Sequence, residues 1–453
     1  MAKILYFKVE DSLSKEEKFK FLNNSENVFN VDFKELTPNK DNVWITEGLE
    51  SDWEYLIPLG TKEAKQLSVV GSQLPVIFKL YSLGVSTNRD AWVYNCSKET
   101  IKNNVNKTIK EFNRNLFERS LNANDDIEKL IEYNDELISW SSTLKNKLRQ
   151  GININYNTKD LRLSIYRPFF KNFLFFNRDL IDRCGQFHKI FPTTDSEKEN
   201  MVICVPSHGG RLPFWCFISN KIVNLALTSI DANQCFPFYT YNEDGTGRKE
   251  NISDWALSEF STNYKDENIT KIAIFYYIYA ILHKPEYREK YAANLRRSLP
   301  RIPMLGLKDI KQSSAASDAE LFWKYSEAGK KLADLHLNYE EQPEYPLTKI
   351  ESEGMQLDWR VDKMKYVKSD DGRLAIKYND FLTLAGIPAE VKEYKLGNRS
   401  ALDWIIDQYR VKTDKRSGIT NDPFRADEPD YIVRLIGKIV TVSLETMKIV
   451  RGL

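Results

Sequence analysis

The densest group of side chains that could bind a polyanion lies between Leu161 and Arg183. This segment, LRLSIYRPFFKNFLFFNRDLIDR, holds five basic, two acidic and six aromatic residues. Arginine forms forked hydrogen bonds with phosphates and guanine edges, whereas interleaved aromatic side chains more often belong to a core. Several arginines cannot all be buried without partners. We therefore expect DNA contacts from Tyr166, Arg167, Arg178 and Arg183.

A second candidate is the glycine-led turn GVSTNRDAW at residues 84–92. It presents Thr, Asn, Arg and Asp in succession, and these side chains offer the donors and acceptors that read base edges. An Asx turn that only joins two strands is an equally good interpretation. The DNA hypothesis predicts contacts from Thr87, Asn88, Arg89 and Trp92.

Two smaller basic groups follow. The turn Ser207–Arg211 has the same character as the first turn, and we expect Arg211 to contact DNA. Arg296 and Arg297, with Arg301 nearby, form a third cluster. For that cluster, solvated surface charge is the favoured interpretation, because exposed pairs of like charges are common.

Motifs for nucleotide chemistry are missing. ATP hydrolysis needs a glycine loop that ends in Lys-Ser or Lys-Thr, and the sequence has none. The stretch Asn421-Asp422-Pro423-Phe424 imitates the base clamp of amino-methyltransferases, but Asp stands where Pro is usual and no glycine-rich cofactor loop precedes it. We interpret it as a turn.

Metal and nucleophile chemistry are equally poorly supported. The five cysteines form no CxxC pair, and Cys204, His208 and Cys216 have no fourth ligand at a customary spacing. No Ser or Cys lies in a hydrolase motif, and no nuclease pattern of carboxylates and lysine is present. The sequence therefore predicts a chain that is not catalytic alone and holds no cofactor.

Composition limits the remaining possibilities. The chain has 453 residues, 65 Lys and Arg against 64 Asp and Glu, 42% hydrophobic and 12% aromatic residues. It is therefore expected to fold, and a polyanionic partner must be met by local patches, balanced by acidic stretches such as 122–136. The longest apolar run, Ile272–Leu282, is 11 residues long, about half of what a membrane helix needs. With no secretory leader evident, we expect a cytoplasmic protein without membrane contact.

The elements that must position these residues begin with a strand at Ile4–Val9, expected to be buried on both faces. Because no helix–strand repeat follows, we expect residues 1–60 to be the end of an α/β domain, with its other strands upstream, and a linker. Ser14 and Glu17 have capping-box spacing and predict a helix start.

Residues 61–250 are expected to form a β-rich recognition domain. Strands are predicted at Pro75–Tyr81 and Ala91–Tyr94, and short β runs alternate with turns from Leu161 to Phe238. Helical periodicity between about 97 and 150 predicts an insertion. The sheets should be mixed or antiparallel.

Residues 251–453 are expected to form a mainly helical part with a small β segment. Helices are predicted at 269–295, 318–335 and 400–409, and the chain should close with a pair of elements at 431–436 and 439–449. The fold class is α+β, with a domain boundary near residue 250.

Three stretches together resemble the C-terminal specificity region of the type ISP restriction-modification enzymes. They are Gly84–Asn95, Tyr276–Met304 and Tyr394–Phe424, and Tyr166-Arg167-Pro168-Phe169 also fits the family. These enzymes are large polypeptides that join nuclease, helicase, adenine methyltransferase and target-recognition parts. The resemblance covers most of the chain from Ile4 onward.

The resemblance implies that residues 1–60 are the end of a methyltransferase-like α/β domain with a linker, and that the remainder is a target-recognition domain that binds a specific sequence in double-stranded DNA. Its other partners would be the upstream methyltransferase, helicase and nuclease domains, and S-adenosylmethionine, ATP and Mg would serve those domains. It does not fix the roles of individual residues. A protein-interaction scaffold is the alternative, because Arg and aromatic residues also dominate protein interfaces. A free-standing methyltransferase is a third possibility, which would require cofactor binding by this chain.

Overall fold

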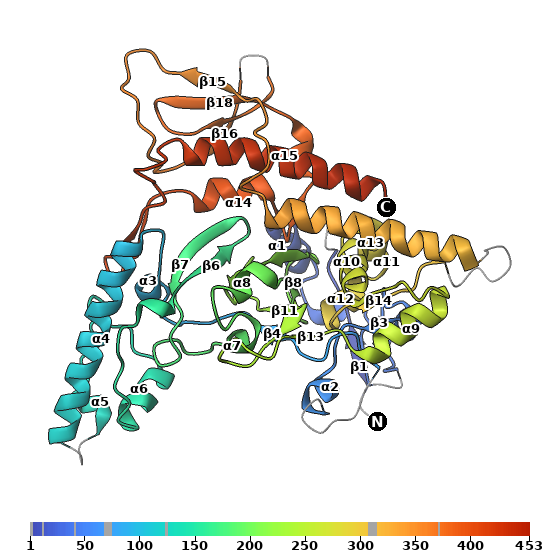
Figure 1. Cartoon of the computed structure of the whole chain (residues 1–453). Helices are drawn as coiled ribbons and strands as arrows, with labels where there is room; N and C mark the ends of the chain where they lie inside the picture. The colour runs from blue at the N-terminus through green and yellow to red at the C-terminus, as the bar shows by residue number, and fades with distance from the viewer. Residues whose placement is uncertain are drawn as a thin grey trace.

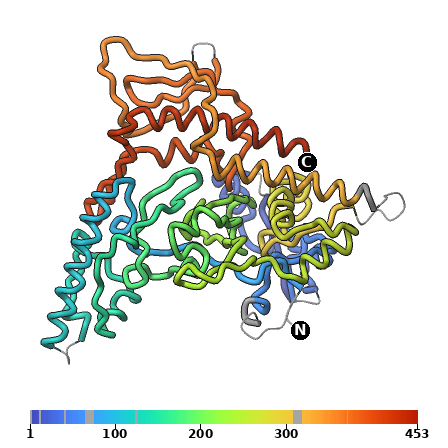
Figure 2. Tube along the Cα trace, viewed as in Figure 1, coloured from blue at the N-terminus to red at the C-terminus, as the bar shows by residue number. Residues whose placement is uncertain are grey.

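The expected α+β architecture is confirmed by the computed structural model, which describes residues 3–10, 13–39, 42–67, 75–122, 126–306, 315–369 and 372–453. The C-terminal elements, orange and red, lie across the top of the molecule, and the green strands of the middle segment lie beneath them (Figures 1 and 2). Residues 123–125 of the expected helical insertion and its acidic stretch lie outside the described ranges.

The N-terminal segment forms a small unit of its own. Helix α1 (Lys15–Asn24) begins with the predicted capping box, in which the Ser14 N–H donates to Glu17 Oε2 at 2.7 Å. Strand β1 (Ile4–Tyr6) pairs antiparallel with β2 (Lys34–Leu36). The expectation of a strand buried on both faces is wrong within this chain, because Leu5 is 51% exposed and α1 buries no residue that could cover it. Next come η1 (Val28–Asn30), η2 (Ser51–Tyr55), β3 (Ile57–Pro58) and α2 (Lys62–Leu67).

Two four-stranded sheets form the middle of the molecule. One has the order β10-β6-β7-β5 and the other β4-β11-β8-β9. Only the β10–β6 pair among these is parallel, so the first sheet is mixed and the second antiparallel, as predicted. The strands are β4 (Ser82–Leu83), β5 (Tyr94–Asn95), β6 (Leu161–Arg167), β7 (Phe170–Phe175), β8 (Val202–Pro206), β9 (Phe217–Ser219), β10 (Ile222–Val223) and β11 (Asn233–Pro237).

The predicted strands at Pro75–Tyr81 and Ala91–Tyr94 are wrong. In the first, only Phe78 forms a bridge, with Ile252. In the second, residues Asp90–Val93 form one helical turn, α3, and strand pairing begins at Tyr94. The N–H groups of Trp92 and Val93 both donate to the Arg89 carbonyl, at 2.9 and 3.3 Å, and these local bonds close a helical turn despite the strand preference of the residue types.

The predicted helical insertion is present. Helix α4 (Lys98–Leu121) starts at Ser97, whose Oγ accepts from the Thr100 N–H, and packs with α5 (Ile127–Leu130) and α6 (Ser142–Arg149). It extends away from the sheets at the left of Figure 1. Short elements complete the middle segment: η3 (Thr158–Asp160), α7 (Phe187–Ile190), α8 (Ser196–Glu199) and the paired strands β12 (Tyr239–Thr240) and β13 (Lys249–Glu250).

A helical layer follows, led by the crossing of α10 (Lys271–Ile281) and α13 (Ala315–Leu337). Gly329 makes this crossing possible, because a Cβ there would lie 1.8 Å from the carbonyl oxygen of Tyr276. Around the pair lie α9 (Asp254–Tyr264), α11 (Pro285–Lys290), α12 (Ala292–Arg297) and β14 (Arg301–Ile302), which pairs with β3.

The last segment combines an antiparallel sheet, a hairpin and a long helix. The sheet has the order β15-β18-β17-β16, from β15 (Thr348–Glu351), β16 (Lys365–Lys368), β17 (Leu374–Lys377) and β18 (Leu382–Ile387). The predicted helix at 400–409 is α14 (Ala401–Gln408), with Ser400 as its N-cap. Smaller elements are η4 (Ala389–Lys392), the pair β19 (Lys395–Leu396) and β20 (Arg399–Ser400), and the hairpin β21 (Lys412–Thr413) and β22 (Thr420–Asn421).

The predicted closing pair is instead one continuous helix, α15 (Tyr431–Arg451). Gly437 does not end it. The Gly437 carbonyl accepts from the Tyr345 N–H at 3.1 Å, so the missing side chain allows a neighbouring segment to approach the helix.

Two hydrophobic clusters hold these layers together. The first cluster contains residues from the middle segment, between Val85 and Cys235, and from the C-terminal segment, between Leu335 and Val442. The second contains residues between Trp53 and Phe238, residues between Ile252 and Ala333, and Val450. Both therefore contain residues from each side of position 250, and the predicted domain division stays a prediction. No helix in the described ranges is long and apolar enough to span a membrane.

Candidate nucleic-acid interface

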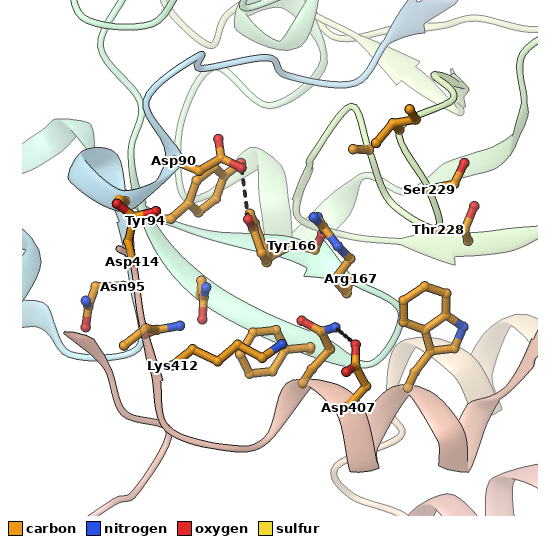
Figure 3. A pocket seen from close by; sticks show the side chains of 18 of the residues that line it. Asp90, Tyr94, Asn95, Tyr166, Arg167, Thr228, Ser229, Asp407, Lys412 and Asp414 are labelled. Atoms are coloured by element: carbon orange, nitrogen blue, oxygen red, sulfur yellow. Dashed lines mark hydrogen bonds between the residues drawn. The ribbon is translucent and has the colours of Figure 1, made fainter. Parts of the chain in front are cut away.

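A cleft of about 700 Å³ opens between the β6–β7 hairpin and the C-terminal segment (Figure 3). One wall comes from α3, β5, β6 and β7, the other from α14 and the β21–β22 hairpin. The loop that contains Thr228, Ser229 and Ile230 forms part of its rim, where Ile230 is 82% exposed. The cleft thus combines residues more than 300 positions apart in the sequence.

On the β wall, Tyr166 and Arg167, two of the residues predicted to contact DNA, line the cleft. They occupy the end of β6, where the tight turn through Pro168 and Phe169 returns the chain into β7. The Tyr166 hydroxyl donates to Asp90 Oδ2 at 2.9 Å, and burial raises its pKa. The Arg167 guanidinium lies 4.1 Å from the centre of the Tyr166 ring. This stacking holds an arginine over an aromatic surface, with donors left for a ligand.

The Arg167 guanidinium makes few polar contacts within the protein. Its Nη1 donates to the Tyr166 carbonyl at 2.6 Å and to Asn224 Oδ1 at 3.3 Å, and it forms no ion pair with a described residue. An arginine has five N–H donors, so several remain available.

The C-terminal wall is organised by Asp407 on α14. Its carboxylate accepts from Arg399 at 2.8 Å, from Gln408 at 2.6 Å and from Arg410 at 3.3 Å. Burial acts to raise the pKa of Asp407, but Lys412 and the two arginines outweigh it and lower that pKa. Burial also lowers the pKa of Lys412, although the nearby negative charge of Asp407 acts in the opposite direction and raises it.

Specific contacts fix the two walls relative to each other. Asn95 Nδ2 donates to the Thr420 carbonyl at 3.1 Å, and the Cys96 N–H donates to Asn421 Oδ1 at 2.7 Å. The Tyr409 hydroxyl donates to the Phe169 carbonyl at 3.2 Å. The cleft is therefore preorganised by polar contacts as well as by the shared core.

Three of the predicted contact residues lie in the interior beside the cleft. Arg89 is 3% exposed and forms an ion pair with Asp182 at 2.9 Å. Its remaining donors reach the carbonyls of Thr87, Ser139 and Leu180 and the Ser141 hydroxyl. Thr87 and Trp92 are 1% and 2% exposed. A side chain so placed is suited to holding the 84–92 turn rather than to touching a base.

The other predicted residues are exposed but lie outside the cleft lining. The side chain of Asn88, at a positive φ of 54°, donates to Asp182 Oδ2 at 2.7 Å. Arg178 pairs with Glu243 at 2.7 Å. Arg183 is exposed and makes no ion pair with a described residue, while its backbone pairs with Ser86.

Arg211 lies at the rim of the cleft. It pairs with Asp231, next to Ile230, at 3.1 Å, and this contact lowers the pKa of Asp231. The same turn reaches α12, because the Gly209 N–H donates to the Arg296 carbonyl at 2.7 Å. Two basic groups that are distant in sequence are thus joined on one surface, with Arg297 also exposed.

Sequence reasoning missed most of the C-terminal wall. No sequence motif includes three residues of this wall, Trp404, Asp407 and Lys412. The only signal for them was that they lie within the Tyr394–Phe424 stretch, which resembles the family. The interpretation of residues 421–424 as a turn is confirmed, because Asp422 Oδ1 accepts from the Phe424 N–H at 2.9 Å. In the described part of the chain, no group of three or more His, Cys, Asp and Glu side chains could hold a metal ion.

Comparison with known proteins gives consistent results. The family described as the Type ISP C-terminal specificity domain matches residues 76–435. No curated protein matches the sequence. Three solved structures cover the whole chain. A nuclease-deletion mutant of the Type ISP restriction-modification enzyme LlaGI, in complex with a DNA substrate mimic, has 32% identity and a TM-score of 0.82. The ATP-dependent Type ISP restriction-modification enzyme LlaBIII bound to DNA has 29% identity and a TM-score of 0.81. The DrdV–DNA complex has 28% identity and a TM-score of 0.83. The chain spans 39%, 27% and 43% of those three chains.

Proposed function

Because the chain belongs to the family of Type ISP C-terminal specificity domains, we propose that it recognises a specific sequence in double-stranded DNA for a larger restriction-modification enzyme. The observation that carries this proposal is the cleft and the arginine within it. Arg167 makes few polar contacts within the protein and faces a ligand-sized space, around which amide, carboxylate and ammonium groups lie. These are the groups that read base edges. The similar LlaGI, LlaBIII and DrdV structures all contain DNA or a DNA mimic, which supports the same conclusion.

The contacts divide into two kinds. Tyr166 and Arg167 are proposed to meet bases, because they line the cleft. Arg178, Arg183 and Arg211 are exposed and suit phosphate contacts that set the register on the duplex. Asn88 is exposed and suits a contact with either a base or a phosphate. Thr87, Arg89 and Trp92 are proposed as positioning residues, because their side chains are buried.

Catalysis is proposed to belong to other domains of such an enzyme. LlaBIII is an ATP-dependent enzyme, and S-adenosylmethionine, ATP and Mg would serve domains of that kind outside this chain. The residues of this chain do not fit those groups: the sequence has no phosphate loop or cofactor loop, and the described residues hold no metal-ligand cluster. The N-terminal unit, with Phe19 56% and Phe29 92% exposed, is the proposed surface for the neighbouring domains.

A salt titration of duplex binding tests this proposal. Fluorescence anisotropy with a labelled duplex should give a binding constant that falls steeply with salt, with a log–log slope of roughly −0.9 per phosphate neutralised. If no duplex binds even at low salt, the DNA proposal fails, and the protein-interaction scaffold becomes the better account. Binding of S-adenosylmethionine by the chain, measured by calorimetry, would favour a methyltransferase instead.

A further inference from the structure

The β21–β22 hairpin carries a basic tip that the cleft alone does not explain. Between the strands, Asp414 Oδ1 accepts from the Ser417 N–H at 2.9 Å and from the Arg416 N–H at 3.2 Å. The Gly418 N–H donates back to the Asp414 carbonyl at 2.9 Å. These bonds fix the conformation of the tip, and they occupy Asp414, the acid closest in sequence.

The two cations at the tip are exposed and lack carboxylate partners. Lys415 and Arg416 are both exposed, and neither forms an ion pair with a described residue. By contrast, Arg399 and Arg410, on the same segment, are both paired with Asp407. The tip therefore presents two exposed cations, beside the single carboxylate of Asp414, on an ordered backbone.

The hairpin stands between two hollows. On one side, Lys412, Thr413 and Asp414 line the cleft. On the other side, Ser417 to Thr420 line a second hollow of about 480 Å³, whose opposite wall is the first half of α4. Lys107 of α4 belongs to that wall. Cations thus continue from Arg167 in the cleft, over the hairpin, to α4.

We propose that the β21–β22 hairpin is an arm that binds the DNA backbone next to the bases recognised in the cleft. This inference rests on the proposed function. Lys415 and Arg416 would neutralise phosphates, with Lys107 extending the path. The base of the arm is held at the end of β5 by the Asn95 and Cys96 hydrogen bonds, so little backbone conformational entropy is lost on binding. Phosphate contacts of this kind add affinity without adding sequence preference.

The test compares the wild-type chain with Lys415→Ala/Arg416→Ala. The matched control is Lys330→Ala/Lys331→Ala, which removes two exposed charges from α13. Anisotropy is measured with labelled duplexes of several different sequences over a series of salt concentrations. The hairpin variant should bind every sequence more weakly, and its log–log salt slope should be shallower by about 2, or about 1 per lost phosphate contact. The control should retain the wild-type slope.

The possible results separate the arm from the proposed function. If the wild-type chain binds DNA and the hairpin variant keeps its slope and affinity, the arm is refuted while DNA recognition stands. If the hairpin variant instead loses preference for one base with an unchanged slope, the tip reads a base and the backbone assignment is refuted. If the wild-type chain does not bind DNA at all, both proposals fail together.

Discussion

Arg89 Nη2 lies 2.9 Å from Asp182 Oδ1, and both side chains are buried. This pair ties the 84–92 turn to the segment after β7, and the Ser141 hydroxyl donates to the same carboxylate oxygen at 2.8 Å. A residue whose type suggested guanine recognition thus belongs to the scaffold of the cleft.

Arg89→Ala should destabilise the protein. Removing Arg89 leaves the buried Asp182 charge without its cation, with only the Asn88 and Ser141 hydrogen bonds remaining, and loss of one partner of a buried pair typically costs about 3–5 kcal/mol. Urea unfolding measures the loss, with Lys198→Ala, from an exposed ion pair, as a control that should leave the free energy of unfolding nearly unchanged. Unchanged stability together with an altered sequence preference would show that Arg89 acts on DNA.

Arg167→Ala should change recognition rather than stability. Loss of a bidentate contact is expected to weaken binding to the preferred sequence by about 1–3 kcal/mol and to relax the preference at one base pair. Lys448→Ala on α15, a side chain 77% exposed, serves as the control and should bind as the wild type does. An equal loss on all sequences would reassign Arg167 to a phosphate.

Acid should destabilise the fold through buried histidines. His336 bonds to the Tyr279 hydroxyl at 2.7 Å and the Thr446 hydroxyl at 2.9 Å, and burial lowers its pKa from 6.5 to about 3. Between these two values the unfolded chain binds a proton that the folded chain does not. Stability is therefore complete above pH 6.5 and falls as pH drops toward 3, by up to about 1.4 kcal/mol per pH unit.

The variant His336→Gln isolates this contribution. It should be less stable than the wild type at pH 7, and the difference should shrink at pH 5, as measured by urea unfolding at both values. If the difference stays constant across this range, His336 is not held neutral by burial.

Gly329→Ala should separate α10 from α13. The added Cβ would overlap the Tyr276 carbonyl, and overpacking of this kind typically costs about 1–3 kcal/mol or more. Gly210→Ala is the control, because its nearest contact, the Ser207 carbonyl oxygen, would lie at 3.4 Å. A thermal unfolding midpoint that falls for Gly329→Ala and not for Gly210→Ala is the expected result. Equal midpoints would contradict the close crossing.

Local signals were predictable from the sequence. The capping box at Ser14, the start of α4 at Ser97 and the start of α14 at Ser400 follow from side chains that satisfy the first N–H groups of a helix. The strand that ends at Tyr166 and Arg167 was also predictable, because its apolar residues lie in a short β-type run bounded by a turn. Information of this kind lies within a few residues of each element.

The rest depends on contacts between distant residues. The cleft closes through Asn95 and Thr420, which are 325 positions apart, and no local pattern encodes that distance. The same reason explains why the burial of Arg89 was not predicted. Its partner Asp182 lies on another segment, and an arginine in a turn is usually exposed. Strand preference failed at α3, where hydrogen bonds to the Arg89 carbonyl close a helical turn.

Sequence-specific DNA binding by this chain can be measured by selection from a pool of random duplexes, followed by sequencing of the bound fraction. The wild-type chain should enrich one motif, and Arg167→Ala should enrich a motif that is degenerate at one position. A bound fraction with the same composition as the starting pool would show that the chain does not recognise a DNA sequence.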